Sequence, residues 1–304
     1  MNRALLTIVL SVVFCGSLFA NEKVVRFYEA PPVVSVAWLS EHIADENLVL
    51  LHIGREPEYK AGHIPGARYI STRDISTTRE ESKLRLQIPP ISKLKATFEK
   101  LGVSNDSRIV LYFGKDWTTP MTRVYFMLDY LGLRNNTSIL DGGMPAWVAS
   151  GKSLSKKAAA SKPGSLNVKA NPDLVATSEW INSKLKDSNV KIVDARTPNH
   201  YTASTAASYP RPGHLPGAKN IPYRSIVDEN LKLKDEKALR KLFTDAGIKP
   251  NDTVVTYCHI GQQASLVYFA AKKLGYKVKL YDGSFEEWSA DKRFEVVGPG
   301  PDKR

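Results

Sequence analysis

Residues 212–218 read Pro-Gly-His-Leu-Pro-Gly-Ala, and nearly the same motif stands earlier in the chain, within Tyr59-Lys-Ala-Gly-His-Ile-Pro-Gly-Ala67. The two copies lie 151 residues apart, counted from His63 to His214. Solenoid repeats recur roughly every 20–50 residues. The much longer period here indicates a duplicated domain.

Further pairs of motifs occur in the same order in both halves of the chain. Trp38 corresponds to Trp180, Ile109–Phe113 to Val254–Cys258, and Val124–Phe126 to Val267–Phe269. Asp141-Gly, followed by Trp147, corresponds to Asp282-Gly, followed by Trp288. The offset falls to 141 residues between the two Asp-Gly pairs. Insertions and deletions therefore lie between the motifs, where loops are expected.

Short apolar runs alternate with helical patterns in the second half. Strands are predicted at residues 190–194, 253–257 and 278–281, and helices at 238–246 and 264–274. Strands separated by helices indicate a parallel sheet covered on both faces. We therefore predict an α/β protein with two tandem domains, each a central, mainly parallel sheet flanked by helices.

The domain boundaries follow from the repeat and from composition. The 304 residues are enough for two ordinary domains. We expect a first domain over residues 21–150, a linker over 151–170 and a second domain over 171–304. The linker is rich in Lys, Ser and Ala and ends near a Pro-Gly pair.

The first twenty residues resemble a secretory signal peptide. Arg3 precedes an apolar run over residues 4–14, and small residues lead to a cleavage site after Ala20. An uncleaved membrane anchor is the alternative, although the run is shorter than the roughly 20 residues of a membrane span. We expect an exported protein, periplasmic if the source is Gram-negative, with no stable membrane insertion after cleavage.

Charge and histidine placement narrow the classes of partner. The formal charge of +12 favours small anionic ligands, but no dense Lys/Arg block suggests nucleic-acid binding. The six histidines are scattered without metal-binding spacing, so no metal is expected. His63 and His214, one in each copy of the repeated motif, are expected to hydrogen-bond loop backbone.

Cysteine usage points to a functional thiol. Removal of the signal peptide would take Cys15 away and leave Cys258 without an internal disulfide partner. Cys258 directly follows a predicted strand and precedes a predicted helix, and parallel sheets bind ligands at the carboxyl ends of their strands. A reactive thiol is therefore favoured over the alternative, a buried and inert one.

The loop after the strand suits an anionic sulfur. Backbone amides of a Gly-containing turn at a helix N-terminus form an anion-binding nest that favours a thiolate. The same amides would stabilise a persulfide anion, and the chemistry needs no cofactor and no general base. The candidate residues of this loop are Cys258 as nucleophile and His259, Ile260, Gly261, Gln262, Gln263 and Ala264 as binding groups.

The repeated motif, the Asp-Gly-x4-Trp ending of each half and the CxxGxxA loop resemble the rhodanese superfamily, in its tandem-domain thiosulfate and 3-mercaptopyruvate sulfurtransferases. The resemblance covers nearly all of the mature chain and implies that only the second domain is catalytic. Phe113 occupies the first-half position of Cys258, and Ile53-Gly-Arg55 is aligned with Asp194-Ala-Arg196. A structural first domain that helps to wall the active site is expected.

The resemblance also implies roles and a reaction. Arg196 is expected beside the cysteine, where its guanidinium would bind an anionic donor, and Asp194 is expected to orient this region. The Cys258 thiolate would take sulfur from the donor as a persulfide and pass it to cyanide or a thiol acceptor, with a sulfur-acceptor protein as a further candidate.

The sequence of the cysteine loop bears on the choice of sulfur donor and on the alternative functions. His259-Ile260 matches neither the basic residues of thiosulfate-preferring relatives nor the Gly-Ser or Gly-Thr of mercaptopyruvate-preferring ones. We favour thiosulfate, with a partly cationic His259, and keep 3-mercaptopyruvate as the alternative. Ala264 stands where a cysteine phosphatase requires arginine. A non-turnover persulfide carrier remains an alternative, whereas a redox sensor would lack a resolving cysteine in the mature chain.

Overall fold

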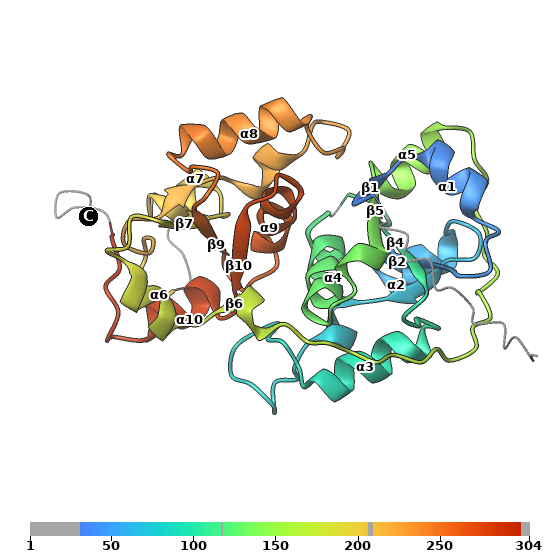
Figure 1. Ribbon diagram of the computed structural model, residues 1–304, viewed down its shortest axis with the longest axis horizontal. Helices are drawn as coiled ribbons and strands as arrows, with labels where there is room; N and C mark the ends of the chain where they lie inside the picture. Colours follow the sequence, from blue (N-terminus) through green and yellow to red (C-terminus); the bar gives the residue numbers. More distant parts are fainter. Residues whose placement is uncertain (1–30, 117, 206–208, 299–304) are drawn as a thin grey trace, which may run out of the picture.

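The computed structural model describes residues 31–116, 118–205 and 209–298, which form two domains side by side (Figure 1). The expected signal peptide, with Cys15 and Ala20, lies outside the described residues. Each domain contains a five-stranded sheet, and every strand pair is parallel. The predicted fold class is confirmed.

The first sheet has the strand order β1-β5-β4-β2-β3. Its strands are β1 (Val33–Val34), β2 (Leu48–Ile53), β3 (Arg68–Ile70), β4 (Arg108–Phe113) and β5 (Thr137–Leu140). The helices of this domain are α1 (Val36–His42), α2 (Glu56–Ala61), α3 (Ile91–Lys100), α4 (Thr118–Tyr130) and α5 (Gly143–Ala149). Core side chains from α3 and α4 cover one face of the sheet, and those from α1 and α5 cover the other.

The second sheet repeats this order as β6-β10-β9-β7-β8. Its strands are β6 (Val175–Ala176), β7 (Val190–Asp194), β8 (Lys219–Asn220), β9 (Thr253–Tyr257) and β10 (Lys277–Tyr281). The helices are α6 (Ser178–Lys184), α7 (Pro198–Tyr201), α8 (Glu236–Asp245), α9 (Ala264–Lys273) and α10 (Ser284–Ala290). Two of the strands, β7 and β9, begin and end where the sequence predicted.

The repeated motif has the same structural task in both domains. Tyr59 stacks on His63 at 3.9 Å and Tyr201 stacks on His214 at 3.9 Å, and each histidine Nδ1 bonds the carbonyl of its tyrosine. The histidines thus hold loop backbone, as predicted. The residue after each histidine donates its amide to a strand tyrosine hydroxyl, at 3.1 Å in both domains.

Two central helices join the domains. Helices α4 and α9 lie between the two sheets (Figure 1), and aromatic pairs across them meet edge to face, Tyr125 with Phe269 and Phe126 with Tyr268. The Tyr268 hydroxyl also donates to Asp129 at 2.8 Å. One apolar cluster runs through both domains. Burial of this shared surface stabilises the domain arrangement as a single unit.

The segment over residues 151–171 connects the domains without a helix or strand. It stays attached to the first domain through backbone bonds from Gly164 to Glu99 and from Lys169 to Leu131, and Leu166 is buried. The connection is therefore an anchored strap, and its hydrogen bonds limit its freedom.

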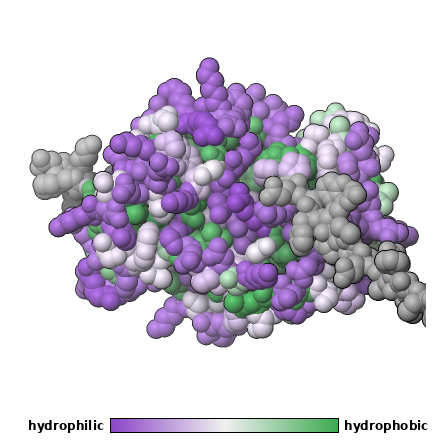
Figure 2. Space-filling model, viewed as in Figure 1, coloured by the Kyte–Doolittle hydropathy of each residue, from purple (hydrophilic) through white to green (hydrophobic). Residues whose placement is uncertain are grey.

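The surface in Figure 2 is largely hydrophilic, with small scattered apolar areas. Among the described residues, the exposed large hydrophobic side chains are Ile91, Val148 and Leu154. In the described part of the chain, no helix combines the length and apolar character that crossing a membrane requires.

Candidate active site

Cys258 lies at the carboxyl end of β9, the middle strand of the second sheet, with 1% of its surface exposed. Its amide donates to the Ser284 hydroxyl at 3.2 Å, and its carbonyl accepts from the Phe285 amide at 3.0 Å. The carbonyl of His259 accepts from the Glu286 amide at 3.1 Å. The start of α10 therefore fixes the backbone of the cysteine and of the next residue.

The loop then turns into α9, which begins at Ala264. Gly261 has a φ of +80°, a conformation that other residues adopt only with strain. A Cβ at this position would lie 3.0 Å from Arg123 Nη1 and 3.1 Å from the carbonyl oxygen of Asp282. Both the turn and the close packing therefore require glycine.

The amides of this loop lack hydrogen-bond acceptors in the part of the chain that the structure describes. Among the described residues, none accepts a hydrogen bond from the amides of residues 259 to 264, whereas those of Ser265 and Leu266 bond within the turn. Consecutive free amides at the start of a ten-residue helix supply positive potential beside the thiol. This arrangement can hold a thiolate or a persulfide anion.

The two glutamines of the loop are placed differently. Gln262 is buried and its Nε2 donates to Thr119 Oγ1 of the first domain at 3.3 Å. Gln263 Oε1 is buried without a hydrogen-bond partner. Gln262 therefore ties the loop to the neighbouring domain, and the predicted binding roles of Ile260, Gln263 and Ala264 stay predictions.

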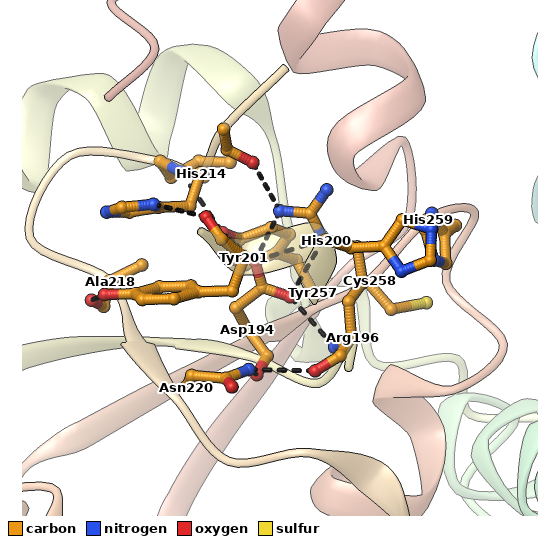
Figure 3. A network of polar contacts seen from close by, with 12 residues as sticks. Asp194, Arg196, His200, Tyr201, His214, Ala218, Asn220, Tyr257, Cys258 and His259 are labelled. Carbon is orange, nitrogen blue, oxygen red and sulfur yellow. Dashed lines mark hydrogen bonds and ion pairs between the residues drawn. The ribbon is translucent and has the colours of Figure 1, made fainter. Parts of the chain in front are cut away.

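Asp194 and Arg196 form a buried ion pair next to the cysteine strand (Figure 3). Arg196 Nε and Nη2 bond both carboxylate oxygens at 2.6–3.1 Å, and Nη2 also donates to the Gly213 carbonyl. The Tyr257 hydroxyl donates to the same carboxylate at 2.6 Å, and the guanidinium lies 4.0 Å over the Phe285 ring. Asp194 thus orients Arg196.

These contacts change what Arg196 can do. Its side chain is fully buried, and among the described residues Nη1 has no hydrogen-bond partner. Direct binding of the donor by Arg196 stays a prediction that rests on this one nitrogen. The guanidinium still contributes to the low pKa of His259, because charges buried in the protein are weakly screened.

His259 is neutral, so the expectation of a partly cationic side chain is wrong. Burial, followed by the nearby charges of Arg196, His200 and Arg85, lowers the pKa of His259 to about 3. Its Nδ1 bonds the Tyr209 hydroxyl at 2.8 Å, and the His200 ring lies edge-on at 4.6 Å. Burial first of all raises the pKa of Tyr209 to about 12. Positive charge beside the cysteine loop therefore comes from groups other than His259.

Tyr209 was not among the predicted site residues. In each domain a short connection joins the stacked tyrosine to its histidine, and Tyr209 lies in the connection of the second domain, from Tyr201 to His214. The corresponding connection of the first domain, from Tyr59 to His63, is shorter. The change in offset from 142 to 151 residues across this connection was the available signal. This change in offset locates an insertion, but it does not indicate that the inserted residues reach the cysteine loop.

The first domain also supplies residues to the site that the sequence did not indicate. Arg123 of α4 is fully buried and its Nη2 bonds Asp282 Oδ1 and the Leu86 carbonyl, each at 2.5 Å. Its Nη1 lies 3.5 Å from the Gly261 carbonyl oxygen. A lone cation in the otherwise uncharged stretch 118–128 was the available signal. The first domain thus walls the site, as expected.

The alignment of Ile53-Gly-Arg55 with Asp194-Ala-Arg196 is wrong by one residue. His52 pairs with Tyr112 in the first sheet as Asp194 pairs with Tyr257 in the second, and each bonds the hydroxyl of its tyrosine. Gly54 then occupies the position of Arg196. Residue type aligns Arg55 with Arg196, whereas the strand register, which the sequence does not show, aligns Gly54 with Arg196.

The first domain has no nucleophile at the corresponding place. Phe113 ends β4 where Cys258 follows β9, and Gly54 and Gly114 stand where Arg196 and His259 stand. A cavity of about 590 Å³ lined by these two glycines opens there. Among the described residues, no group of three or more His, Cys, Asp or Glu side chains is placed to hold a metal ion.

Comparison with known proteins agrees with this geometry. The family model for the rhodanese-like domain matches the chain twice, over residues 35–150 and 177–291. The chain belongs to the rhodanese-like family. Both copies of the domain contain one five-stranded parallel sheet, and only the second presents a cysteine at the end of its middle strand.

Several relatives align with nearly the whole chain. A thiosulfate sulfurtransferase of Pseudomonas aeruginosa is 30% identical over 86% of this chain and 95% of its own length. The sulfur carrier protein TtuD of Thermus thermophilus is 32% identical over the same shares. The crystal structure of the 3-mercaptopyruvate sulfotransferase SseA from Escherichia coli superposes with a TM-score of 0.74 at 28% identity, covering 84% of this chain and 99% of SseA.

Proposed function

We propose that this protein is a sulfurtransferase that moves a sulfane sulfur from thiosulfate to a thiophilic acceptor through a persulfide on Cys258. The observation that carries the proposal is the thiol at the end of β9, followed by six amides without an acceptor in the described protein. The relatives named for thiosulfate sulfurtransferase support the same reaction class.

The first half-reaction is a displacement at sulfur. The Cys258 thiolate forms an S–S bond with the outer sulfur of thiosulfate, the existing S–S bond breaks, and its electron pair leaves with sulfite. The negative charge of the thiolate leaves with sulfite, and the outer sulfur keeps the charge that it carried in thiosulfate and becomes the terminal sulfur of the persulfide. The amides after Cys258 stabilise negative charge throughout, without moving during the reaction.

The second half-reaction restores the enzyme. Cyanide or a thiolate attacks the terminal persulfide sulfur, and the Cys258 thiolate leaves as the S–S bond breaks. The products are thiocyanate or a new persulfide, and no electrons are gained or lost by the protein. The buried position of Cys258 keeps water away from the persulfide between the two steps.

Two alternatives keep the persulfide and change its context. The relative SseA supports 3-mercaptopyruvate as donor, and the relative TtuD supports delivery of sulfur to an acceptor protein. Thiosulfate is preferred because the cysteine loop lacks the Gly-Ser or Gly-Thr pair that the resemblance associates with mercaptopyruvate.

Steady-state turnover of residues 21–304 with thiosulfate and cyanide tests the proposal, with thiocyanate as the readout. Turnover should vanish in Cys258→Ser, and 3-mercaptopyruvate is tested in parallel. Turnover with mercaptopyruvate alone would replace the donor. Absence of turnover with either donor in a folded protein, together with a persulfide detected by mass spectrometry, would favour the carrier.

We also propose that the protein is exported, on the basis of the apolar run after Arg3 and the small residues before Ala20. In a Gram-negative source the mature protein would work in the periplasm. Fractionation of cells that express the full chain, with N-terminal sequencing of the product, checks this. A product that stays in the cytoplasm with residues 1–20 intact would overturn it.

A further inference from the structure

In the segment over residues 85–88 of the first domain, three residues bond the second domain beside the cysteine loop, and the fourth, Leu86, bonds within the first domain. They lie in the loop between the first sheet and α3, which reaches toward the second domain in Figure 1. Gln87 Nε2 donates to the Asp282 carbonyl at 3.3 Å, and the Ile88 amide donates to Asp282 Oδ2 at 2.8 Å. The Leu86 carbonyl accepts from the buried Arg123. This segment is therefore firmly positioned.

Arg85 is the first residue of this segment and is held by two bonds to one carboxylate. Its amide donates to Glu286 Oε2 at 2.8 Å, and its Nε donates to Glu286 Oε1 at 2.7 Å. The Glu286 amide in turn holds the His259 carbonyl at 3.1 Å. A first-domain guanidinium is thus fixed to the backbone of the cysteine loop through a single residue.

The side chain of Arg85 is accessible from solvent. It is 45% exposed, in contrast to the fully buried Arg196. It interacts with Tyr209, whose hydroxyl bonds His259 Nδ1 at 2.8 Å. The positive charge of Arg85 contributes to the low pKa of His259, and Tyr209 lies within electrostatic reach of both Arg85 and Cys258. Arg85 therefore lies within electrostatic reach of the cysteine loop.

The basic side chains near Cys258 differ in how many hydrogen-bond donors they leave for a ligand. Arg196 has one free nitrogen and is buried, and His259 is neutral. Arg85 uses Nε for the Glu286 carboxylate, and its side chain, which is 45% exposed, interacts with Tyr209. A planar guanidinium with free terminal nitrogens suits the oxygens of a sulfonate-like group through paired hydrogen bonds.

We propose that Arg85, contributed by the domain without a cysteine, binds the oxygen-bearing end of the anionic sulfur donor at the mouth of the Cys258 pocket. The inference rests on the proposed function, because it names the residue that binds the donor of that reaction. It also accounts for a cysteine loop that carries His259-Ile260 where a basic pair would otherwise supply charge. Glu286 positions Arg85 and at the same time opposes its charge.

Calorimetric binding of thiosulfate in a Cys258→Ser background tests this without sulfur transfer. Arg85→Gln should raise the dissociation constant about ten-fold, the size expected for loss of a charge-assisted hydrogen bond. Glu286→Gln should lower it, because the opposing charge is gone while an amide oxygen can still hold Arg85. Arg79→Gln is the matched control, since Arg79 is an exposed arginine of the same loop that bonds Lys83.

Turnover in the native-cysteine protein gives the second readout. Arg85→Gln should raise the KM for thiosulfate about ten-fold and weaken inhibition by sulfite, while kcat changes little. Equal affinity in the Arg85 and Arg79 variants would overturn the inference even in an active enzyme. Conversely, thiosulfate that binds through Arg85 but gives no turnover would uphold the inference and count against the proposed reaction.

Discussion

Replacement of Arg123 by methionine is the sharpest test of how the first domain supports the site. Arg123 is fully buried, and its guanidinium bonds Asp282 Oδ1, the Leu86 carbonyl and, at longer range, the Gly261 carbonyl. Methionine retains an unbranched apolar chain but has no charge and no donor. Of its bonds to described residues of the first domain, the Asp282 side chain then keeps the one from the Ile88 amide.

The magnitude follows from the burial of the pair. Removing one partner of a buried ion pair costs about 3–5 kcal/mol, because the other charge stays buried without compensation. The Asp282 side chain is 10% exposed and keeps one amide donor, which favours the lower end of this range. We expect Arg123→Met to lower the free energy of unfolding by about 3 kcal/mol.

Equilibrium urea unfolding, followed by tryptophan fluorescence, measures the change. Asp282→Asn in the same background removes the stranded charge and should recover about 1 kcal/mol or more, so that the double-mutant cycle shows clear coupling. Turnover with thiosulfate should fall in Arg123→Met, because the 85–88 segment and Gly261 lose a common anchor. At matched urea, the Cys258 thiol should also become more accessible to alkylation.

A loss below about 1 kcal/mol in Arg123→Met would refute the reasoning, because it would mean that water or a local rearrangement replaces the pair. Strictly additive losses in the two single variants would refute it as well, since residues in direct contact are expected to couple. Normal stability with lost turnover would show that the contact serves the site without supporting the fold.

Four further outcomes are expected. Gly261→Ala should abolish most turnover, whereas Gly247→Ala, with a φ of +76° and open space around it, should lose only about 1–2 kcal/mol of stability; equal turnover in the two variants would contradict this. Asp194→Asn should cost about 3–5 kcal/mol in urea unfolding, because its arginine partner stays buried without a counter-charge; a wild-type urea midpoint would count against the pair. His259→Asn should leave the pH profile of kcat between pH 6 and 7 unchanged, because the pKa near 3 lies far below that range; an inflection that disappears in the variant would show a cationic histidine. Burial, followed by the charge of His63, lowers the pKa of His52 to about 4. Between about pH 6.5 and 4 the unfolded chain therefore binds a proton that the folded chain does not, and the free energy of unfolding should fall by about 3 kcal/mol as the pH drops through this range. This loss should be absent in His52→Gln, and identical acid titrations of the two proteins would disprove it.

The fold was predictable because its signals are local or repeated. The run Thr253–Tyr257 is apolar and β-branched enough to indicate a buried strand, and it is β9. The repeated motif fixed the duplication, since both copies need the same stacked tyrosine and histidine. The position of Cys258 between strand and helix could therefore be derived from order along the chain alone.

The shape of the site could not be derived in this way. Arg85, Arg123 and Tyr209 lie far from Cys258 in the sequence, and their contacts depend on how two domains meet and on the path of an insertion. The charge of His259 was mistaken for a related reason, because its pKa depends on burial and on neighbours from other segments. Likewise, the alignment at Ile53 is off by one residue because the pairing of β2 with β4, which fixes it, is not visible in the sequence.

The interface between α4 and α9 has a consequence for the autonomy of the catalytic half. The α9 residues from Ala264 to Ala271 are all buried, and several of them pack on or bond to the other half of the chain. Expressed by itself, the half with Cys258 would expose Tyr268 and Phe269 to water. We therefore expect the duplicated domains to depend on each other for folding, because the copy without a thiol covers the apolar face of α9 in the catalytic copy.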